Sequence, residues 1–527
     1  MNNFKNTVAN DLLSCILTLG TEISLTKKDI MEMFEYPPDS SLGDIAFPCF
    51  KLSRILRKAP PVIAKEISAS LSSSVISKAE AVNGYLNIFV SNDYLIKNVL
   101  FKIEEEKEQY GSDGSGKGKV AVFDYSSPNV AKPFHIGHLG TTVIGHSLKM
   151  LHKFQGYDCV GINYLGDWGT QFGKLRVAYN LWGDKERVAN GGVDELVALY
   201  VKFHAEAEND PSLNQRAREE FTKLEQHDET NISLWKWFVE ISLAEYQKTY
   251  KQLGIEFDSY KGESFYTDKM PAQIQALRDK NLLKIDDGAS IVDLSEYNMP
   301  PCLILKRDGS TLYPTRDIAA AVYRKQTYNF DKCIYVTSAG QSLHFAQWFK
   351  VVELMGYDWH DKLVHVPYGT VSINNEKLAT RTGNVILLKD LFATAIEKVT
   401  EIMDEKNPNL PNKAEVAEAV GVGSVIFYYL YNNRIKDINF VMSDALSFEG
   451  NTGPYAQYTY ARTSGILEKA GNIDFYNITP EITAPEEAEL LKVLSKFNEA
   501  VRGAINDYEP SVITRYIIDV CSSFNKF

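Results

Sequence analysis

The pattern of hydrophobic and polar positions between residues 119 and 167 predicts a strand, a helix and a second strand. Residues 119–127, "KVAVFDYSS", are rich in β-branched and aromatic side chains and end in turn-forming residues. Residues 135–156 carry apolar side chains at helical spacing and end at Gly156. Residues 159–167, "CVGINYLGD", have the character of another buried strand. This alternation is typical of a parallel sheet with helices on both faces.

A further strand and helix lie much later in the chain. Residues 332–340, "KCIYVTSAG", are typical of a strand, and residues 342–356 follow with helical spacing. We expect this pair to complete the same parallel sheet. The long charged stretch between the two halves, around residues 184–260, has helical periodicity and predicts a largely α-helical insertion.

The two ends of the chain differ from this pattern. Residues 1–112 mix helical and alternating segments, which predicts an α+β domain. A tract of Gly, Ser and Lys at 111–119 is the best candidate for a linker. From about residue 390 the pattern is helical almost throughout. We therefore expect three domains, 1–112, 118–390 and 391–527, which agrees with ~100–200 residues per domain.

Composition adds few constraints. The net charge is 56 − 68 = −12, which argues only weakly against nucleic acid because a local basic face decides such binding. The six cysteines form no C-x-x-C pair and the nine histidines are scattered, so we expect free thiols, a reducing cytoplasm and no structural metal. No run approaches ~18 apolar residues, so we expect no membrane span. The apolar run near residues 12–19 predicts an amphipathic helix rather than a signal peptide.

The segment between the first strand and its helix holds the candidate chemistry. Residues 126–140 read "SSPNVAKPFHIGHLG". Pro128 and Pro133 predict an extended, non-helical loop. The helix that follows begins with unpaired N–H groups and a dipole that favours negative charge. Its N-terminus is therefore suited to a phosphate group.

Two histidines stand at this helix start. His135 and His138 are three residues apart and point the same way along the first turn, where imidazoles can donate hydrogen bonds to phosphate oxygens. Gly137 between them leaves room for a flat base or sugar. A metal site would need a third ligand and a supporting carboxylate, and the loop offers neither. Two surface histidines without a function are the other alternative, which the surrounding prolines and the preceding strand disfavour.

These residues resemble a known family. "HIGH" after a first strand is similar to the signature of class I aminoacyl-tRNA synthetases, and "DYSSPNVAKPFHIGH" resembles the arginyl-tRNA synthetases in particular. The resemblance runs from about residue 40 to the C-terminus. Four further stretches carry it in the same order: "NYLGDWGTQFGKL" (163–175), "YPTRDIAAAVYR" (313–324), "GQSLHFAQ" (340–347) and "LSFEGNTGPYAQYTYAR" (446–462).

The resemblance implies a Rossmann-like α/β catalytic domain with a parallel sheet, an N-terminal α+β domain that contacts tRNA, and a C-terminal all-α helical bundle that binds the anticodon. Such enzymes activate L-arginine with ATP and Mg²⁺, release diphosphate, and transfer arginine from arginyl-adenylate to the 2′-hydroxyl of the terminal adenosine of tRNA(Arg). Positioning and charge stabilisation supply the catalysis, so no protein nucleophile is needed. The resemblance further implies a cytoplasmic monomer with no membrane partner.

By resemblance, ATP binding falls mainly on the loop and the helix start. His135 and His138 would bind the ATP phosphates in the transition state, and Lys132 would add a cation, unless it is only a solvated loop lysine. Further residues expected on the nucleotide side are Pro128, Phe134, Gly137 and His344.

The second nucleotide loop of the class, K-M-S-K-S, resembles "EKLATRTGN" at residues 376–384. This stretch keeps the first lysine as Lys377, but the second lysine is absent and Arg381 stands nearby. Lys377, Arg381 and Lys132 are thus the candidate cations for the β- and γ-phosphates. We hypothesise that Lys132 takes part of the missing role.

Recognition of arginine requires acidic and amide groups that face a planar guanidinium. Tyr313 and Asp317 are four residues apart and share one face of a predicted helix start. Asp317 could alternatively serve only the helix dipole. By resemblance, the arginine-binding residues are Asn129, Asn163, Glu263, Tyr313, Asp317 and Gln341.

The helical C-terminal part resembles the anticodon-binding bundle. Tyr455, Gln457, Tyr458 and Arg462 are the expected tRNA-binding residues, because aromatic faces stack on unpaired bases. Some tyrosines of this segment could instead belong to the core. Members of the family usually continue for some tens of residues beyond "CSSFNKF", so we expect a C-terminally truncated bundle with less stable last helices and weaker charging.

Three other functions compete with arginine–tRNA ligation. A synthetase for another amino acid would not need both Tyr313 and Asp317. An inactive relative that binds nucleic acid or acts as a scaffold would fit the altered second loop. A Rossmann oxidoreductase would need G-x-G-x-x-G after the first strand, where none occurs.

Overall fold

The structure, a computed structural model, describes residues 1–20, 24–374, 376–377, 386–471 and 477–527. The chain forms two compact units. One unit contains residues 1–113, 458–506 and 515–527, and the other contains residues 114–457 and 507–514. The second unit holds the candidate chemistry.

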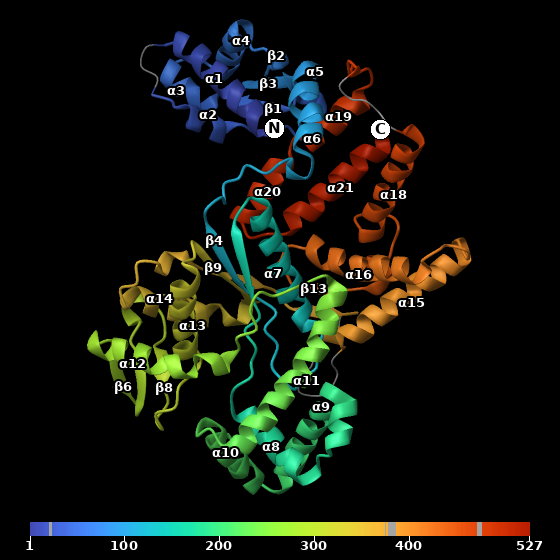
Figure 1. Cartoon of the computed structure of the whole chain (residues 1–527). Helices are drawn as coiled ribbons and strands as arrows, with labels where there is room; N and C mark the ends of the chain where they lie inside the picture. Colours follow the sequence, from blue (N-terminus) through green and yellow to red (C-terminus); the bar gives the residue numbers. More distant parts are fainter. Residues whose placement is uncertain (21–23, 375, 378–385, 472–476) are drawn as a thin grey trace. The chain divides into compact units, whose positions relative to one another are not determined.

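A four-stranded parallel sheet forms the centre of the second unit (Figure 1). Its order is β10-β9-β4-β5, so the two halves of the sequence pattern lie side by side, as expected. The bounds are β4 (Val120–Asp124), β5 (Asp158–Ile162), β9 (Lys332–Ser338) and β10 (Leu363–Tyr368). The predicted parallel α/β fold is confirmed.

Helices cover both faces of this sheet because the side chains of β4 alternate in direction. Ala121 and Phe123 join a core with α7 (Gly137–Phe154). Val122 joins a different core with α13 (Tyr313–Tyr328) and α14 (Ser342–Leu354). The carboxyl ends of the strands therefore open between α7 and α13.

A helical lobe follows β5, as the charged periodic stretch predicts (Figure 1). Its core includes Phe172, Leu196 and Phe238. The helices are α8 (Thr170–Trp182), α9 (Lys185–Asn209), α10 (Ser212–Glu225) and α11 (Glu229–Leu253). The chain then returns towards α13 through the 3-10 helix Glu263–Lys269, α12 (Met270–Asp279) and an antiparallel sheet of β6 (Leu283–Asp286), β7 (Ala289–Val292) and β8 (Cys302–Leu305).

Two further helices pack into the core of the sheet, although the sequence places them in the helical C-terminal part. Phe392 and Val425 belong to the same cluster as Phe123. The remaining elements of this unit are β11 (Val371–Ile373), β12 (Glu376–Lys377), α15 (Leu388–Lys406), α16 (Lys413–Tyr431), β13 (Ile438–Phe440) and α17 (Met442–Ala445).

The first unit joins the two ends of the chain. Leu491 packs into the N-terminal core, and the Lys492 Nζ lies 2.9 Å from the Asp44 Oδ1. Its antiparallel sheet has the order β1-β3-β2, with β1 (Ile45–Pro48), β2 (Ile76–Val82) and β3 (Tyr85–Val90). Its helices include α1 (Asn2–Thr18), α2 (Lys27–Met33), α3 (Phe50–Leu56), α4 (Pro60–Ser70), α5 (Asn92–Leu95), α6 (Phe101–Glu106), α19 (Pro485–Leu494) and α20 (Phe497–Asn506).

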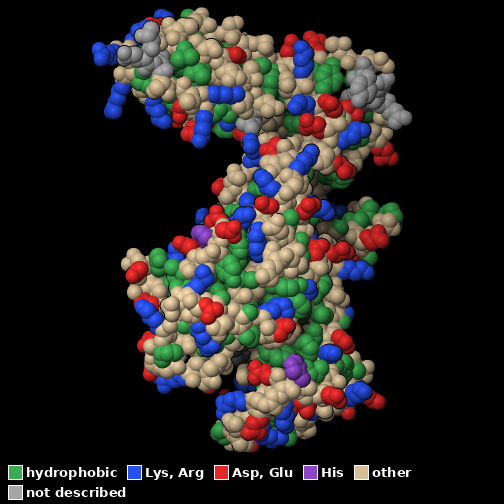
Figure 2. Space-filling view, turned by 60° about the vertical axis from the view of Figure 1, so that its left-hand side comes forward, with side chains coloured by type: hydrophobic (Ala, Val, Ile, Leu, Met, Phe, Trp, Pro, Cys, Tyr) green, Lys and Arg blue, Asp and Glu red, His purple; other side chains and the backbone are tan. Residues whose placement is uncertain are grey.

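Two helices have residues in both units, namely α18 (Gly453–Ala470) and α21 (Ser511–Lys526). Of the described helices, none is long and apolar enough to cross a membrane. On the face that Figure 2 shows, Lys and Arg side chains are interspersed with Asp and Glu side chains.

Candidate active site

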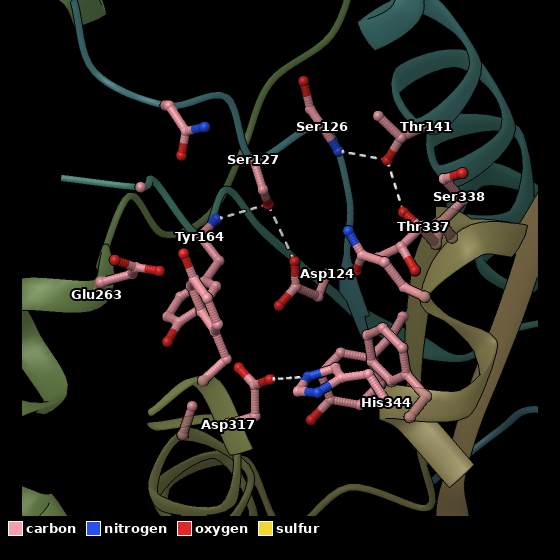
Figure 3. A pocket seen from close by; sticks show the side chains of 18 of the residues that line it. Asp124, Ser126, Ser127, Thr141, Tyr164, Glu263, Asp317, Thr337, Ser338 and His344 are labelled. Carbon is pink, nitrogen blue, oxygen red and sulfur yellow. Dashed lines mark hydrogen bonds and ion pairs between the residues drawn. The ribbon is translucent and has the colours of Figure 1, made fainter. Parts of the chain in front are cut away.

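A cavity of about 580 Å³ lies at the carboxyl ends of the central strands. This is the expected place for a ligand in a sheet of this kind. Seven of the residues singled out by sequence line it: Asn129, His138, Glu263, Tyr313, Asp317, Gln341 and His344. Figure 3 shows the carboxylates of Glu263, Asp124 and Asp317 around the same open space.

The two histidines of the "HIGH" segment are held by backbone N–H groups. The Gly137 N–H donates to the His135 Nδ1 at 3.0 Å, and the His135 N–H donates to the His138 Nδ1 at 3.2 Å. A neutral imidazole that accepts at Nδ1 carries its proton on Nε2. Both rings therefore present an Nε2–H donor, with ring centroids 4.0 Å apart.

Burial keeps both imidazoles neutral. It lowers the pKa of His138 to about 3 and lowers the pKa of His135, and the nearby Lys132 acts in the same direction. The histidines can thus donate hydrogen bonds to an anion but do not supply positive charge at neutral pH. Lys132, half-buried in the loop, is the adjacent cation, and burial lowers its pKa.

The prolines predicted an extended loop before α7, but part of this loop has a different backbone conformation. Ser126, Ser127 and Ala131 have φ values of 70°, 47° and 55°, in the left-handed region. Such strain persists where surrounding bonds fix the backbone. The Ser127 hydroxyl donates to the Asp124 Oδ1 at 3.0 Å and accepts the Tyr164 N–H at 3.0 Å (Figure 3).

Asp317 and His344 are in direct contact on the cavity wall. The His344 Nε2 lies 2.6 Å from the Asp317 Oδ2 (Figure 3). The Asp317 Oδ1 forms no bond to the described residues, so it can accept a further donor. His344, expected on the nucleotide side, thus contacts the carboxylate expected to bind arginine.

Glu263 forms an ion pair with Arg316 of the first turn of α13. The Arg316 Nη1 lies 2.7 Å from the Glu263 Oε2, and both side chains are about one-eighth exposed. Burial raises the pKa of Glu263 to about 7, although Arg316 opposes this shift. The guanidinium of Arg316 also lies 5.8 Å from the ring centroid of Tyr313.

A buried ion pair at the base of the cavity was not predicted from the sequence. The Arg324 Nη2 lies 2.7 Å from the Asp124 Oδ2, and its guanidinium lies between the rings of Tyr164 and Tyr335 at 5.3 and 5.4 Å. The helical spacing of Tyr313, Asp317, Ala320 and Arg324, all of which line the cavity, is the signal that could have identified Arg324.

The other residues predicted for substrates have varied positions. Asn163 is fully buried and donates from Nδ2 to the Tyr250 hydroxyl at 2.9 Å, so it is not on the cavity wall. Phe134 stacks on His138 with centroids 5.2 Å apart, and the Pro128 carbonyl accepts the Gly166 N–H.

Gly137 makes room for a neighbouring side chain of the protein. A Cβ at Gly137 would lie 2.8 Å from the His135 ring, so this glycine accommodates that imidazole whether or not a nucleotide approaches. Lys377 ends the short strand β12, and Arg381 lies outside the described residues.

The residues predicted to contact tRNA lie along α18. Tyr458 and Tyr460 are 56% and 74% exposed, whereas Tyr455 is half-buried, so the segment has both of the environments expected. The Gln457 Nε2 donates to the Ala419 carbonyl, and the Arg462 Nη1 donates to the Asn525 Oδ1 at 2.6 Å.

Three family descriptions match successive parts of the chain. "Arginyl tRNA synthetase N terminal domain" matches residues 2–90, and "tRNA synthetases class I (R), catalytic domain" matches residues 98–442. "DALR anticodon binding domain" matches residues 456–527. The catalytic match covers more than half of the chain.

Curated relatives match the chain from end to end. An arginine–tRNA ligase from Alkaliphilus metalliredigens is 49% identical over 100% of this chain and 92% of its own length. One from Clostridium botulinum is 50% identical with the same coverage.

Solved structures show the same fold at lower identity. The arginyl-tRNA synthetase of Thermus thermophilus has a TM-score of 0.79 at 23% identity, and covers 98% of this chain and 90% of its own. That of Plasmodium falciparum has a TM-score of 0.81 at 22% identity, and covers 99% of this chain and 91% of its own.

Proposed function

The chain belongs to the arginyl-tRNA synthetase family, and from this premise we propose that it joins L-arginine to tRNA(Arg) at the expense of ATP. The observation that carries the proposal is the single cavity that combines Asp317, Glu263 and Gln341 with His138 of the phosphate-binding helix start. An amino acid with a guanidinium and a nucleotide phosphate would meet there.

In the first step, an oxygen of the arginine carboxylate attacks the α-phosphorus of ATP, supplied as its Mg²⁺ complex. The bond from the α-phosphorus to the β-phosphate oxygen breaks, and diphosphate leaves with that electron pair. Negative charge grows on the phosphate oxygens, where the Nε2–H groups of His135 and His138 donate hydrogen bonds and Lys132 supplies the cation. The neutral state of both histidines supports this division of roles.

Two carboxylates are suited to the guanidinium. Asp317 keeps Oδ1 available while His344 holds Oδ2, and Glu263 lies on another part of the same wall. A carboxylate gives a guanidinium short, charge-assisted hydrogen bonds that an ammonium cannot reproduce in the same geometry. Gln341 and Tyr313 complete the pocket, and Asn129 lies at the end where the α-amino and carboxylate groups would sit.

In the second step, the 2′-hydroxyl of the terminal adenosine of tRNA attacks the activated carbonyl carbon, and AMP leaves. A charging assay with tRNA(Arg) tests both steps. We expect radiolabelled arginine to become acid-precipitable with tRNA ending in adenosine or 3′-deoxyadenosine, but not with tRNA ending in 2′-deoxyadenosine. Charging of the 2′-deoxy tRNA would rule out this site of attachment.

We further propose that the chain acts in the cytoplasm as a monomer, as its resemblance to this family implies. Sedimentation of the protein with and without tRNA(Arg) tests this. A dimer in both conditions would contradict it.

A further inference from the structure

A larger cavity, of about 790 Å³, lies beside the first one and has no role in the chemistry above. Tyr313 lines both cavities and is 66% exposed. Arg316 lines the larger cavity and forms its ion pair with Glu263, which lines the smaller one. The two spaces therefore meet at the first turn of α13.

The walls of this second cavity offer free positive charge. Arg218 of α10 and Lys306 of the loop before α13 line it, and neither forms an ion pair with the described residues. Two of the carboxylates on the same wall have partners. Asp268 forms an ion pair with Lys269 at 2.7 Å, whereas Asp308 accepts hydrogen bonds from the N–H and the hydroxyl of Ser310 and keeps its negative charge.

The cavity also has an aromatic wall and a carboxylate that could accept a hydrogen bond. The ring centroids of Trp168 and Phe221 are 5.8 Å apart, and the two rings are nearly perpendicular. The carboxylate of Glu225 accepts no hydrogen bond from the part of the chain that the structure describes. An exposed carboxylate with open acceptor positions, such as that of Glu225, matches an exocyclic amino group of a base, as cytosine has.

We propose that this second cavity binds the nucleotide that precedes the terminal adenosine at the single-stranded 3′ end of tRNA. Its phosphate would contact Arg218 and Lys306, its base would lie against Trp168 and Phe221, and the amino group of that base, a cytosine in tRNA, would donate to Glu225. Stacking surfaces next to cations are the usual features of sites for single-stranded nucleic acid.

Size and position favour this occupant over the reaction's small substrates. The arginine carboxylates and the "HIGH" histidine already line the first cavity, so arginine and the α-phosphate have their place there. The second cavity is large enough for a nucleotide and meets the first at Tyr313, so that with the terminal adenosine in the first cavity the preceding nucleotide would lie in the second. The proposal rests on the proposed function, because only an enzyme that charges tRNA needs this subsite.

The test uses the full-length enzyme with the double variant R218A/K306A. We expect the KM for intact tRNA(Arg) to rise about tenfold, since two phosphate contacts are lost. A tRNA(Arg) without its last three nucleotides cannot reach the cavity, so its inhibition constant should stay within about twofold of the wild-type value. The KM for arginine should not change. Arg216, exposed on the same helix and absent from the cavity wall, gives the control variant R216A.

Parallel weakening of intact and shortened tRNA would overturn the proposal, because Arg218 and Lys306 would then contact the tRNA duplex. An unchanged KM for intact tRNA would also overturn it. If the proposed function itself were wrong, the result would be different, because the wild-type enzyme would then charge no tRNA with arginine.

A second variant on the exposed Glu225 tests the base contact. Wild-type enzyme should prefer cytidine to uridine at the penultimate position by about tenfold in kcat/KM. E225Q should reduce this preference to about twofold or less, because an amide can donate to the uracil carbonyl as well as accept. Equal use of both tRNAs by the wild-type enzyme would refute the contact to Glu225.

Discussion

At the residue scale, the site depends on how neighbours set the charge of each side chain. His135 and His138 are neutral donors because burial lowers their pKa values and backbone N–H groups fix their tautomers. The sequence indicated the phosphate site at these histidines, but it could not show their charge state. That state depends on burial, which is set by distant residues such as those of α11 and α16 that pack around α7.

The pKa of Glu263, about 7 in the free enzyme, predicts a pH-dependent affinity for arginine. A guanidinium favours the ionised carboxylate, so below pH 7 binding requires loss of a proton. We expect the KM for arginine to rise by up to about tenfold for each pH unit below 7, and Glu263→Gln to remove this slope. The KM for ATP over the same range is the control. An identical slope in wild type and variant would contradict the assignment.

At the element scale, the strand–helix alternation gave the parallel sheet, and the non-helical loop before α7 was expected. The left-handed residues of that loop were not, because Ser126 and Ser127 depend on bonds to Thr141, Asp124 and Tyr164, which are distant in sequence or on other elements. Helical spacing from Tyr313 could have indicated Arg324 as a cavity residue, but not its ion pair, since its partner Asp124 comes from a strand 200 residues earlier.

The structure of the loop and of the start of α7 predicts how removal of the Lys132 side chain changes the rate of ATP–pyrophosphate exchange. Because both histidines are neutral, removal of this lysine takes away the cation next to them. Lys132→Ala should slow ATP–pyrophosphate exchange about 100-fold, and Lys132→Arg should retain most of the rate. Lys153→Ala, exposed near the other end of α7, is the matched control. An exchange rate unchanged in Lys132→Ala would show that another cation acts on the phosphates.

The packing of α7 against β4 requires a glycine at Gly145, although helix propensity alone would favour alanine there. A Cβ at Gly145 would lie 2.3 Å from the Tyr125 Cβ. Gly145→Ala should destabilise the protein by about 1–2 kcal/mol, because overpacking outweighs the gain in propensity. At Gly465 of α18 a Cβ meets nothing within 4 Å, so Gly465→Ala should be stabilising by about 0.5–1 kcal/mol. Calorimetric unfolding compares the two, and equal effects would refute the packing argument.

At the scale of the whole molecule, the chain forms two units. One holds the central sheet and its cavities, and the other contains residues from both ends of the chain. Four histidines of the sheet unit have pKa values lowered mainly by burial: His138 to about 3, and His146, His152 and His365 each to about 4. The unfolded chain binds protons at these groups below about pH 6.5, whereas the folded chain does not.

Acid should therefore destabilise the sheet unit, since folding stability rises with pH wherever the unfolded state holds more protons. We expect the free energy of unfolding to fall from pH 6.5 towards pH 4, because these four histidines outweigh Glu263, whose raised pKa of about 7 acts in the opposite direction over this range. Each of these histidines would account for at most about 1.4 kcal/mol per pH unit. Urea titrations across this range measure the effect. A denaturation midpoint that does not change down to pH 5 would contradict it.

The central claim is that the cavity formed by α7 and α13 selects arginine for activation, and ATP–pyrophosphate exchange in the presence of tRNA(Arg) tests it most directly. With each of the twenty amino acids supplied in turn, wild-type enzyme should show exchange with arginine alone. Asp317→Asn should raise the KM for arginine on the order of 100-fold, because a carboxylate–guanidinium contact is lost, and change the KM for ATP less than about threefold. Glu353→Gln, an exposed carboxylate on α14, should change neither. Exchange supported by another amino acid, or an Asp317→Asn enzyme with an unaltered KM for arginine, would contradict the account.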